Sequence, residues 1–217
     1  MNNSSCTSIS SLFCKNKLPC ECDCENNSRQ SPIDIKRSTL NLGKTELLNV
    51  NYKTVSLYKY LDSDEYKYKP INDYILSFNT YTFKLLNVHF HKTSEHKIDG
   101  NEYDMEAHFV HKAIDTEEYV VLAFFINLVD ENASDKNIDE TLSLQDTATI
   151  TMPDLGDDVF YTYKGSLTTG SFNSDVEWCV FEKPLEAYIS KRDRFNHIGA
   201  RPIQYSVYPS EVFTFTY

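Results

Sequence analysis

Two short histidine-containing segments constrain this chain more than any other feature of its sequence. The first, residues 88–91, reads VHFH, and the second, residues 106–108, reads EAH. Side chains of an extended strand alternate between its two faces, so His89 and His91 point the same way and Phe90 points to the opposite face. The two imidazoles therefore form half of a tetrahedral metal site.

A third histidine follows at a distance that fits a hairpin. Asp99-Gly100 is a turn signal, and residues 103–112 alternate again, so that Glu106, His108 and Val110 share one face. Antiparallel pairing of the two runs would bring His108 beside the first two histidines. Three neutral histidines on a rigid sheet leave a fourth coordination position open, which is the pattern of a catalytic zinc site. The alternative is two half-buried strands whose histidines are satisfied in the core.

The overall composition bounds the kind of protein. A chain of 217 residues with 41% hydrophobic residues fits one large domain with a full core. Its 15 Tyr and 13 Phe favour strands over helices. A formal charge of −11 argues against nucleic acid or an anionic membrane surface as a partner, and no apolar run is long enough for a transmembrane segment.

The first 28 residues differ from the rest of the chain. They are rich in Ser, Asn and Cys, show no periodicity, and are predicted to form a flexible arm before a single domain over 29–217. No continuous apolar stretch marks a signal peptide, so we favour reduced thiols and the cytoplasm, although disulfides or a soft-metal site remain alternatives. The cysteines of the arm are Cys6, Cys14, Cys20, Cys22 and Cys24. Cys179 lies in an apolar run and is interpreted as a small buried hydrophobe.

Alternating and apolar runs predict a sheet-dominated fold. The run over 118–128 is apolar on both faces and is expected to be a central strand. Short helices are predicted only over 142–148 and 185–193, which makes a doubly wound parallel fold improbable. The other predicted strands cover 40–52, 54–60, 75–78, 81–91, 103–112, 160–167, 176–181 and 203–207.

Several sequence blocks together resemble the α-class carbonic anhydrases. QSPIDI, HFH, SEHKIDG, EAHFVH, GSLTTG, VEW and ARPIQ occur in the order seen in that family, from about Gln30 to the C-terminus. The resemblance implies a mainly β (α+β) domain built on a large twisted, mostly antiparallel sheet with few short helices. It also implies zinc-dependent reversible hydration of carbon dioxide to bicarbonate and a proton through zinc-bound hydroxide, for which this family is the standard example.

The resemblance also assigns roles to individual residues. His89, His91 and His108 would bind Zn²⁺. Asn87 and Glu106 stand where the family places groups that hold the first and third ligands, although the family usually has Gln at the first of these positions.

Further positions match the substrate side of the family's site. Thr168 matches a hydroxyl that donates to a carboxylate, here Glu95, and accepts from the zinc-bound hydroxide. Thr169 would be a second polar group near bicarbonate. The residues that match the apolar wall for carbon dioxide are Val110, Val121, Leu167, Val176 and Trp178. Taken singly, each of these five is better explained as a core residue than as part of a substrate pocket.

No proton-shuttle histidine is evident. The resemblance places the family's shuttle near residues 72–74, where the sequence is Asn-Asp-Tyr, and Tyr74 would be a poor proton carrier at neutral pH. Of the histidines that are not ligands, His96 and His111 match buried structural residues, and His197 lies outside the shuttle position. The family's two prolines after the threonine pair are replaced by Gly170 and Ser171, and a cysteine of its extracellular members is replaced by Phe172.

Two other functional classes fit parts of the sequence. HFHKTSE matches the first half of a cupin metal motif, which would indicate an iron or manganese oxygenase or isomerase, but the upstream glycine and the second motif are missing. A catalytically weak or inactive module that binds a glycan or a protein is the second alternative. Retention of all three histidines together with Glu95 and Thr168 argues against it.

Overall fold

The computed structural model describes most of the chain beyond the N-terminal arm. The described residues are 29–43, 48–62, 65–133, 147–153, 155–156, 158–170, 172, 174–189, 199–205 and 211–217. The predicted arm and its five cysteines lie outside these ranges, so their redox state stays a prediction. Among the described residues, no helix is long and apolar enough to cross a membrane.

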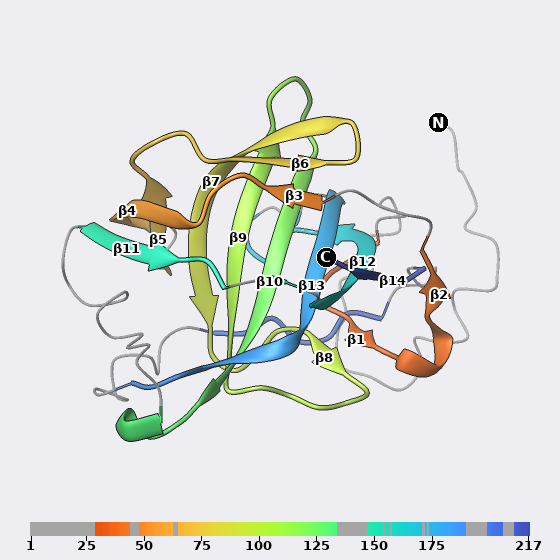
Figure 1. Cartoon of the computed structure of the whole chain (residues 1–217). Helices are drawn as coiled ribbons and strands as arrows, with labels where there is room; N and C mark the ends of the chain where they lie inside the picture. The colour runs from red at the N-terminus through yellow and green to blue at the C-terminus, as the bar shows by residue number, and fades with distance from the viewer. Residues whose placement is uncertain are drawn as a thin grey trace, which may run out of the picture.

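Five long strands form the middle of a twisted 12-stranded sheet (Figure 1). β10 pairs in parallel with β13, whereas the other neighbours among these strands pair antiparallel. Nearly every residue of β10 is buried, as expected for a central strand that is apolar on both faces. The bounds are β7 (Tyr81–His91), β9 (Met105–Ala113), β10 (Tyr119–Leu128), β12 (Val159–Ser166) and β13 (Ser174–Ala187).

Seven further strands extend this sheet on both sides. The order is β11-β4-β5-β7-β9-β10-β13-β12-β14-β2, and β3 joins through β6, which pairs with β7. Their bounds are β2 (Asn41–Leu42), β3 (Leu48–Val50), β4 (Thr54–Asp62), β5 (Glu65–Pro70), β6 (Ile75–Phe78), β11 (Thr147–Thr151) and β14 (Phe213–Thr216). A separate parallel pair and two short 3-10 helices complete the described elements: β1 (Asp34–Ile35), β8 (Lys97–Ile98), η2 (Arg37–Thr39) and η3 (Glu131–Ala133). The predicted mainly β, mostly antiparallel fold is therefore confirmed.

Both predicted helices are wrong where the structure describes them. Thr147 and Ala148 begin β11, and residues 142–146 lie outside the described ranges. β13 continues to Ala187 over the first part of the predicted helix 185–193, because its backbone stays paired with β10. Hydrogen bonding to a neighbouring strand thus overrides a local helical pattern, which is a weak preference by comparison.

One predicted strand is wrong, and two strands of the structure were not predicted. Residues 203–205 are not in a strand, and the last described strand is β14, which the sequence analysis missed. β5 was missed as well, although Tyr66 and Tyr68 alternate with charged residues in its sequence EYKYKP. This omission matters, because β5 lies beside the ligand-bearing strand β7.

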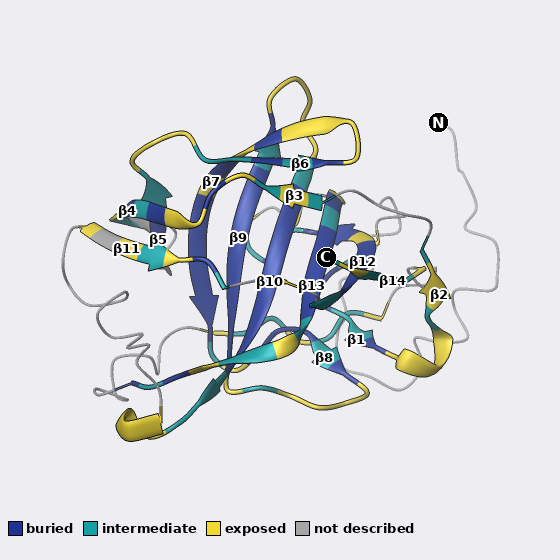
Figure 2. Ribbon diagram, viewed as in Figure 1, coloured by how far each residue is buried: buried dark blue, intermediate teal, exposed yellow. Residues whose placement is uncertain are grey.

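The central strands are buried because apolar side chains pack on both faces of the sheet (Figure 2). One core cluster, here called the large core, contains Phe90, Phe109, Leu122 and Cys179, and Cys179 is fully buried, as predicted. The other, here called the tryptophan core, surrounds Trp178 on the opposite face. Strand alternation directs every second residue of β7 and β9 toward the tryptophan core.

Candidate metal centre

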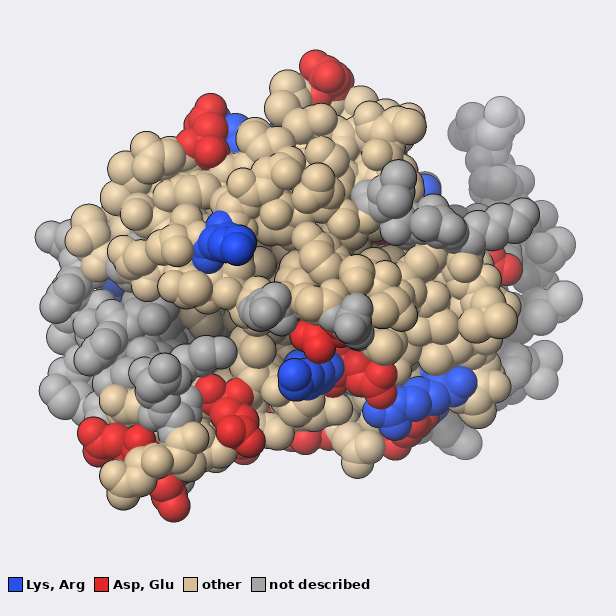
Figure 3. Space-filling model, in the orientation of Figure 1, with Lys and Arg blue, Asp and Glu red and all other residues tan. Residues whose placement is uncertain are grey.

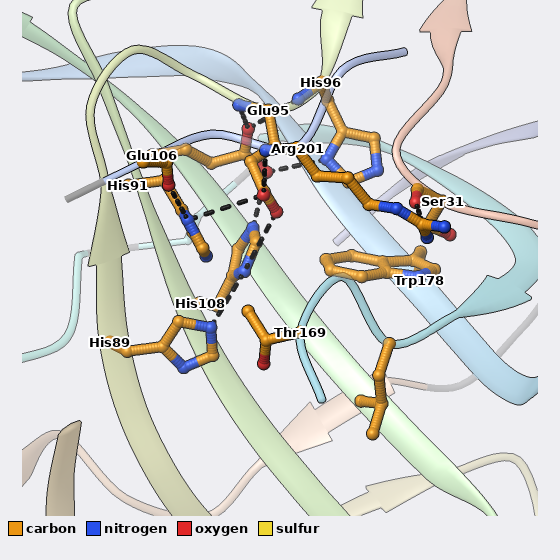
Figure 4. A network of polar contacts seen from close by, with 12 residues as sticks. Ser31, His89, His91, Glu95, His96, Glu106, His108, Thr169, Trp178 and Arg201 are labelled. Atoms are coloured by element: carbon orange, nitrogen blue, oxygen red, sulfur yellow. Dashed lines mark hydrogen bonds and ion pairs between the residues drawn. The ribbon is translucent and has the colours of Figure 1, made fainter. Parts of the chain in front are cut away.

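The three predicted ligand histidines converge in the middle of the sheet. In the register of β7 and β9, His89 lies directly opposite His108, and His91 lies opposite Glu106. One ring nitrogen from each histidine lies within 4.8 Å of the corresponding nitrogens of the other two. Figure 4 shows the three imidazoles directed toward one another. All three are buried. The predicted antiparallel pairing, which brings His108 beside His89 and His91, is confirmed.

A different acceptor holds each of these imidazoles. The bonds are His89 Nδ1 to Asn87 Oδ1 at 2.8 Å, His91 Nδ1 to Gly199 O at 2.9 Å, and His108 Nε2 to Glu106 Oε1 at 2.7 Å. Because the acceptors are oxygens, we assign the N–H to the bonded nitrogen of each ring. The second nitrogen of each ring then carries a lone pair that faces the shared space.

Among the described residues, no donor satisfies these lone pairs. His91 Nε2 is buried with no hydrogen-bond partner in this part of the chain, and His108 Nδ1 lies 3.3 Å from His89 Nε2. Two acceptor nitrogens at that separation repel each other unless a cation or a proton lies between them. Three neutral imidazoles with fixed orientations are the donor set of a zinc site that keeps a fourth position open. The residues present therefore fit a zinc ion.

Burial keeps two of the ligand histidines, His89 and His108, neutral. It lowers the pKa of His89 well below the usual value, with additional lowering by the nearby charges of His91 and His108. It also lowers the pKa of His108, although the carboxylate of Glu106 acts in the opposite direction. Neutral imidazole is the form that binds a metal, so both groups are ready to act as ligands at neutral pH.

Glu106 is an ionised carboxylate at the centre of this network. Burial works to raise its pKa, but the electrostatic interactions with His96 and His108 and the hydrogen bonds from both rings hold it well below the usual value. Its Oε2 accepts from the backbone N–H groups of Glu95 and His96, each at 2.8 Å. His96, Glu106 and His108 also lie close enough to hold an ion, but their facing atoms already bond one another.

The structure places Thr168 and Glu95 at the site without joining them. Glu95 is buried, and its Oε1 accepts from the backbone N–H of Arg201 at 2.8 Å. Glu95 Oε2 is buried, has no hydrogen-bond partner among the residues that the structure describes, and lies 4.0 Å from His108 Nδ1. Thr168 is buried just after β12, but the described residues show no hydrogen bond between its hydroxyl and Glu95. The role of this pair therefore stays a prediction.

The five predicted wall residues belong to one apolar cluster. Val110, Val121, Val176 and Trp178 are members of the tryptophan core, and Leu167 packs against it. The Trp178 ring lies 4.9 Å from the His108 ring, and its Nε1–H donates to the Ser166 carbonyl at 3.0 Å. Trp178 thus connects the metal ligands with the loop that carries the two threonines.

Three contributors to the site were missed from the sequence. Gly199 orients His91 through its backbone carbonyl, which leaves no side-chain signal. Arg201 donates its backbone N–H to Glu95, and its guanidinium lies 3.9 Å from the centre of the Phe172 ring, on the loop after the threonines. Lys67 Nζ lies 3.5 Å from Thr169 Oγ1 and was missed with strand β5.

The expected shuttle position near residues 72–74 is wrong. Tyr74 packs against the large core, with its ring 5.5 Å from that of Tyr52 and its hydroxyl accepting from Ser56 N at 2.8 Å. It therefore lies on the face of the sheet opposite the three ligand histidines, and a histidine there would not reach the metal site. His96 and His111 are buried, as expected, and His197 lies outside the described residues.

Comparisons with known proteins agree with this geometry. The model of the family described as eukaryotic-type carbonic anhydrase matches residues 15–202. A carbonic anhydrase from Nostoc is 29% identical over 198 residues, covering 83% of this chain and 74% of that protein. Alpha carbonic anhydrase 3 of Arabidopsis thaliana is 32% identical, covering 74% of this chain and 62% of that protein. The α-carbonic anhydrase of Thermovibrio ammonificans, solved with the inhibitor sulfanilamide, superposes with a TM-score of 0.72 at 27% identity, over 85% of this chain and 86% of that one.

Proposed function

Because the chain belongs to the eukaryotic-type carbonic anhydrase family, we propose that it binds zinc and catalyses the reversible hydration of carbon dioxide to bicarbonate and a proton. The observation that carries the proposal is the convergence of His89, His91 and His108, with one nitrogen of each held by an acceptor and the other facing the shared space. Zinc bound there supplies a hydroxide nucleophile at neutral pH, a property for which this family is the standard example.

The residues around the ligands have separate tasks in this proposal. Asn87, Gly199 and Glu106 fix the tautomer and direction of the three imidazoles. The tryptophan core offers carbon dioxide, which is small and apolar, a surface from which water is excluded.

Thr168 would orient the nucleophile through its hydroxyl. A carboxylate accepts hydrogen bonds but cannot donate them, so a hydroxyl bonded to Glu95 must use its only proton there. Its oxygen is then left to accept from the nucleophile, which fixes the direction of attack. Glu95 Oε2, buried without a partner, is the atom that this bond would satisfy.

The test combines metal analysis with a stopped-flow assay of carbon dioxide hydration. We expect one tightly held zinc per chain and turnover above that of the free ion. Thr168→Ala should keep its zinc, because no ligand changes, and should lose about 10²-fold in kcat, the usual cost of removing a positioned polar group. Protein that holds no zinc, or iron in its place, would overturn the proposal.

One observation favours a second candidate, an inactive or weakly active binding module for a glycan or a protein. The described residues show no hydrogen bond between Thr168 and Glu95, and that bond is the part of the site that serves only catalysis. The same assay separates the two candidates. Zinc-loaded protein without turnover, and with no further loss in Thr168→Ala, would support the binding module.

A further inference from the structure

A strained aromatic residue lies on the loop that carries the two threonines. The backbone of Phe172 has a φ of 52°, in the left-handed region that glycine tolerates and that is an outlier for a bulky side chain. The side chain is also 41% exposed, although it is apolar. Strain of this kind persists only where surrounding contacts offset it, so the contacts of the Phe172 ring indicate what holds the loop in place.

The ring of Phe172 stacks against the side chain of Arg201. The carbon at the centre of the guanidinium lies 3.9 Å from the ring centre, well within the roughly 6 Å at which a cation and an aromatic face attract each other. A guanidinium is planar, so it can cover an aromatic ring with one face while its N–H groups form hydrogen bonds within its own plane. Arg201 can therefore hold Phe172 and a second segment of the chain at the same time.

That second segment is the beginning of the domain. The Nη1–H of Arg201 donates to the Ser31 carbonyl at 2.7 Å, and its Nη2–H donates to Gln30 Oε1 at 3.0 Å. Figure 4 shows the guanidinium beside Ser31. Ser31 is in turn fixed to the end of β12, because its N–H donates to Ser166 Oγ at 3.0 Å and its Oγ accepts from the Ser166 N–H at 3.1 Å. The guanidinium thus connects Phe172 to an anchored part of the sheet.

The partners of this guanidinium differ from those of basic side chains at the surface. On the face shown in Figure 3, basic side chains lie in small groups beside acidic ones. Arg37, for example, pairs with Asp99 and Glu182. The described partners of the Arg201 guanidinium are instead a carbonyl, an amide oxygen and an aromatic ring. It therefore links segments through fixed directions, which an exposed ion pair does only weakly.

The backbone around Arg201 reaches the metal centre itself. The N–H of Arg201 donates to Glu95 Oε1 at 2.8 Å, and the nearby Gly199 carbonyl accepts from His91 Nδ1 at 2.9 Å. Residues 199–201 therefore hold one ligand histidine, the Glu95 carboxylate and, through the guanidinium, the loop that carries Thr168.

We propose that Phe172 and Arg201 form a clamp that positions the threonine loop, here residues 167–170 and 172, beside the metal centre. Both are positioning residues, because the clamp acts through Thr168, whose hydroxyl must stay close to Glu95 to perform its proposed role. The effect on turnover rests on the proposed function, whereas the effect on the loop does not. Without the stack, the strained backbone of Phe172 loses its compensation and the loop leaves this conformation more often.

The experiment measures hydrogen–deuterium exchange of the zinc-loaded full chain, in peptides that contain Thr168 and Phe172, together with kcat and KM for carbon dioxide. Phe172→Leu keeps an apolar side chain and the strained backbone but removes the aromatic face. We expect exchange in these peptides to become about 2–5-fold faster, which corresponds to the usual strength of an exposed contact between a cation and an aromatic ring. The value of kcat should fall by up to the same factor, with KM nearly unchanged because the apolar wall is intact.

Two variants control for the general effects of changing a phenylalanine. Phe172→Tyr keeps the ring face and should retain the exchange and turnover of the unmodified protein. Phe215→Leu makes the same change at a half-buried ring in the large core, on the opposite face of the sheet, where its centre lies 5.6 Å from that of Phe160. It should lower overall stability without changing exchange in the threonine loop.

Arg201→Lys tests the other half of the clamp. Lysine keeps the positive charge but lacks the planar face and the paired N–H groups. Exchange in the threonine loop should again become faster, and adding Phe172→Leu to this variant should change it little further, because both residues act through one contact. Arg37→Lys makes the same change at an arginine that does not contact the loop, and it should leave exchange there unchanged.

The outcomes separate this inference from the proposed function. Unchanged exchange in folded, zinc-loaded Phe172→Leu overturns the clamp, even if the protein hydrates carbon dioxide. Equally faster exchange in Phe215→Leu also overturns it, because the effect would then be one of overall stability. In an active protein, faster exchange without any fall in kcat overturns the positioning of Thr168. Faster exchange in Phe172→Leu and Arg201→Lys, in a protein without turnover, would support the clamp and contradict the enzymatic proposal.

Discussion

His108 and His111 lie three residues apart on β9, both buried, yet their surroundings are different. His108 faces the tryptophan core side, where its Nε2–H donates to the Glu106 carboxylate and its ring lies 5.1 Å from that of His89. His111 faces the large core, where its Nε2 lies 2.6 Å from the Tyr52 hydroxyl. The ring of Tyr52 stacks on that of His111, with 6.0 Å between their centres.

The difference teaches that the partners of a histidine decide whether it binds a metal. Burial lowers the pKa of both rings, to about 3 for His111, so both are neutral at pH 7. A carboxylate acceptor fixes the proton of His108 on Nε2 and leaves Nδ1 to face two further imidazoles. His111 belongs to no cluster of metal-binding side chains among the described residues, and its hydroxyl partner serves packing.

The largest expected effect is the loss of zinc when His108 is removed. His108→Ala leaves two imidazoles, too few for a stable site, so dialysed protein should contain almost no zinc. His111→Ala should keep one zinc per chain but lose about 2–4 kcal/mol of stability, because it creates a cavity and leaves the buried Tyr52 hydroxyl without its partner. Metal analysis and urea unfolding measure the two quantities. Equal zinc content in both variants would contradict the assignment of the two faces.

A smaller effect is expected when Glu106 is changed while all three ligands remain. Glu106→Gln removes the charge that fixes the His108 tautomer, and groups of this kind typically contribute about 10–100-fold to metal affinity. Competition with a chromophoric chelator measures the change. The control is Glu102→Gln, a partly exposed acid paired with Lys97, which should leave zinc affinity unchanged. Similar losses in both variants would indicate a general charge effect instead.

The same contrast explains what the sequence could predict. The positions of His89, His91 and His108 follow from strand alternation and one hairpin register, which local residue patterns reveal. Local patterns do not reveal the role of the Gly199 carbonyl, because a backbone group has no side-chain signal. They also do not reveal the face of the sheet on which Tyr74 lies, because that depends on how β6 joins β7. A resemblance to a family places residues by their order along the chain, which does not determine the face of a sheet on which they lie.

Strand β5 and the end of β13 were missed from the sequence for two different reasons. Residues 65–70 form β5, which pairs with the neighbouring strand β4, and the alternation of Tyr66 and Tyr68 with charged residues is itself a strand signal that the many charges obscured. Residues 185–187 carry a helical pattern but stay extended because β10 pairs with them. Only the second miss depends on a contact between distant segments, which a single sequence does not display.

The smallest expected effect concerns His111 in the large core, which should make the stability of the protein depend on pH. An unfolded His111 takes up a proton near its usual pKa of 6.5, whereas the folded ring stays neutral until about pH 3. Between these values unfolding binds an additional proton, so stability falls as the pH is lowered, by about 1.4 kcal/mol per unit. His111→Gln cannot titrate, so its metal-free form should lose about 1 kcal/mol less between pH 6.5 and 5.5 than the metal-free unmodified protein, because the unfolded ring is half protonated at pH 6.5. Urea unfolding at the two pH values measures this difference, and equal losses would show that His111 is not a buried neutral histidine.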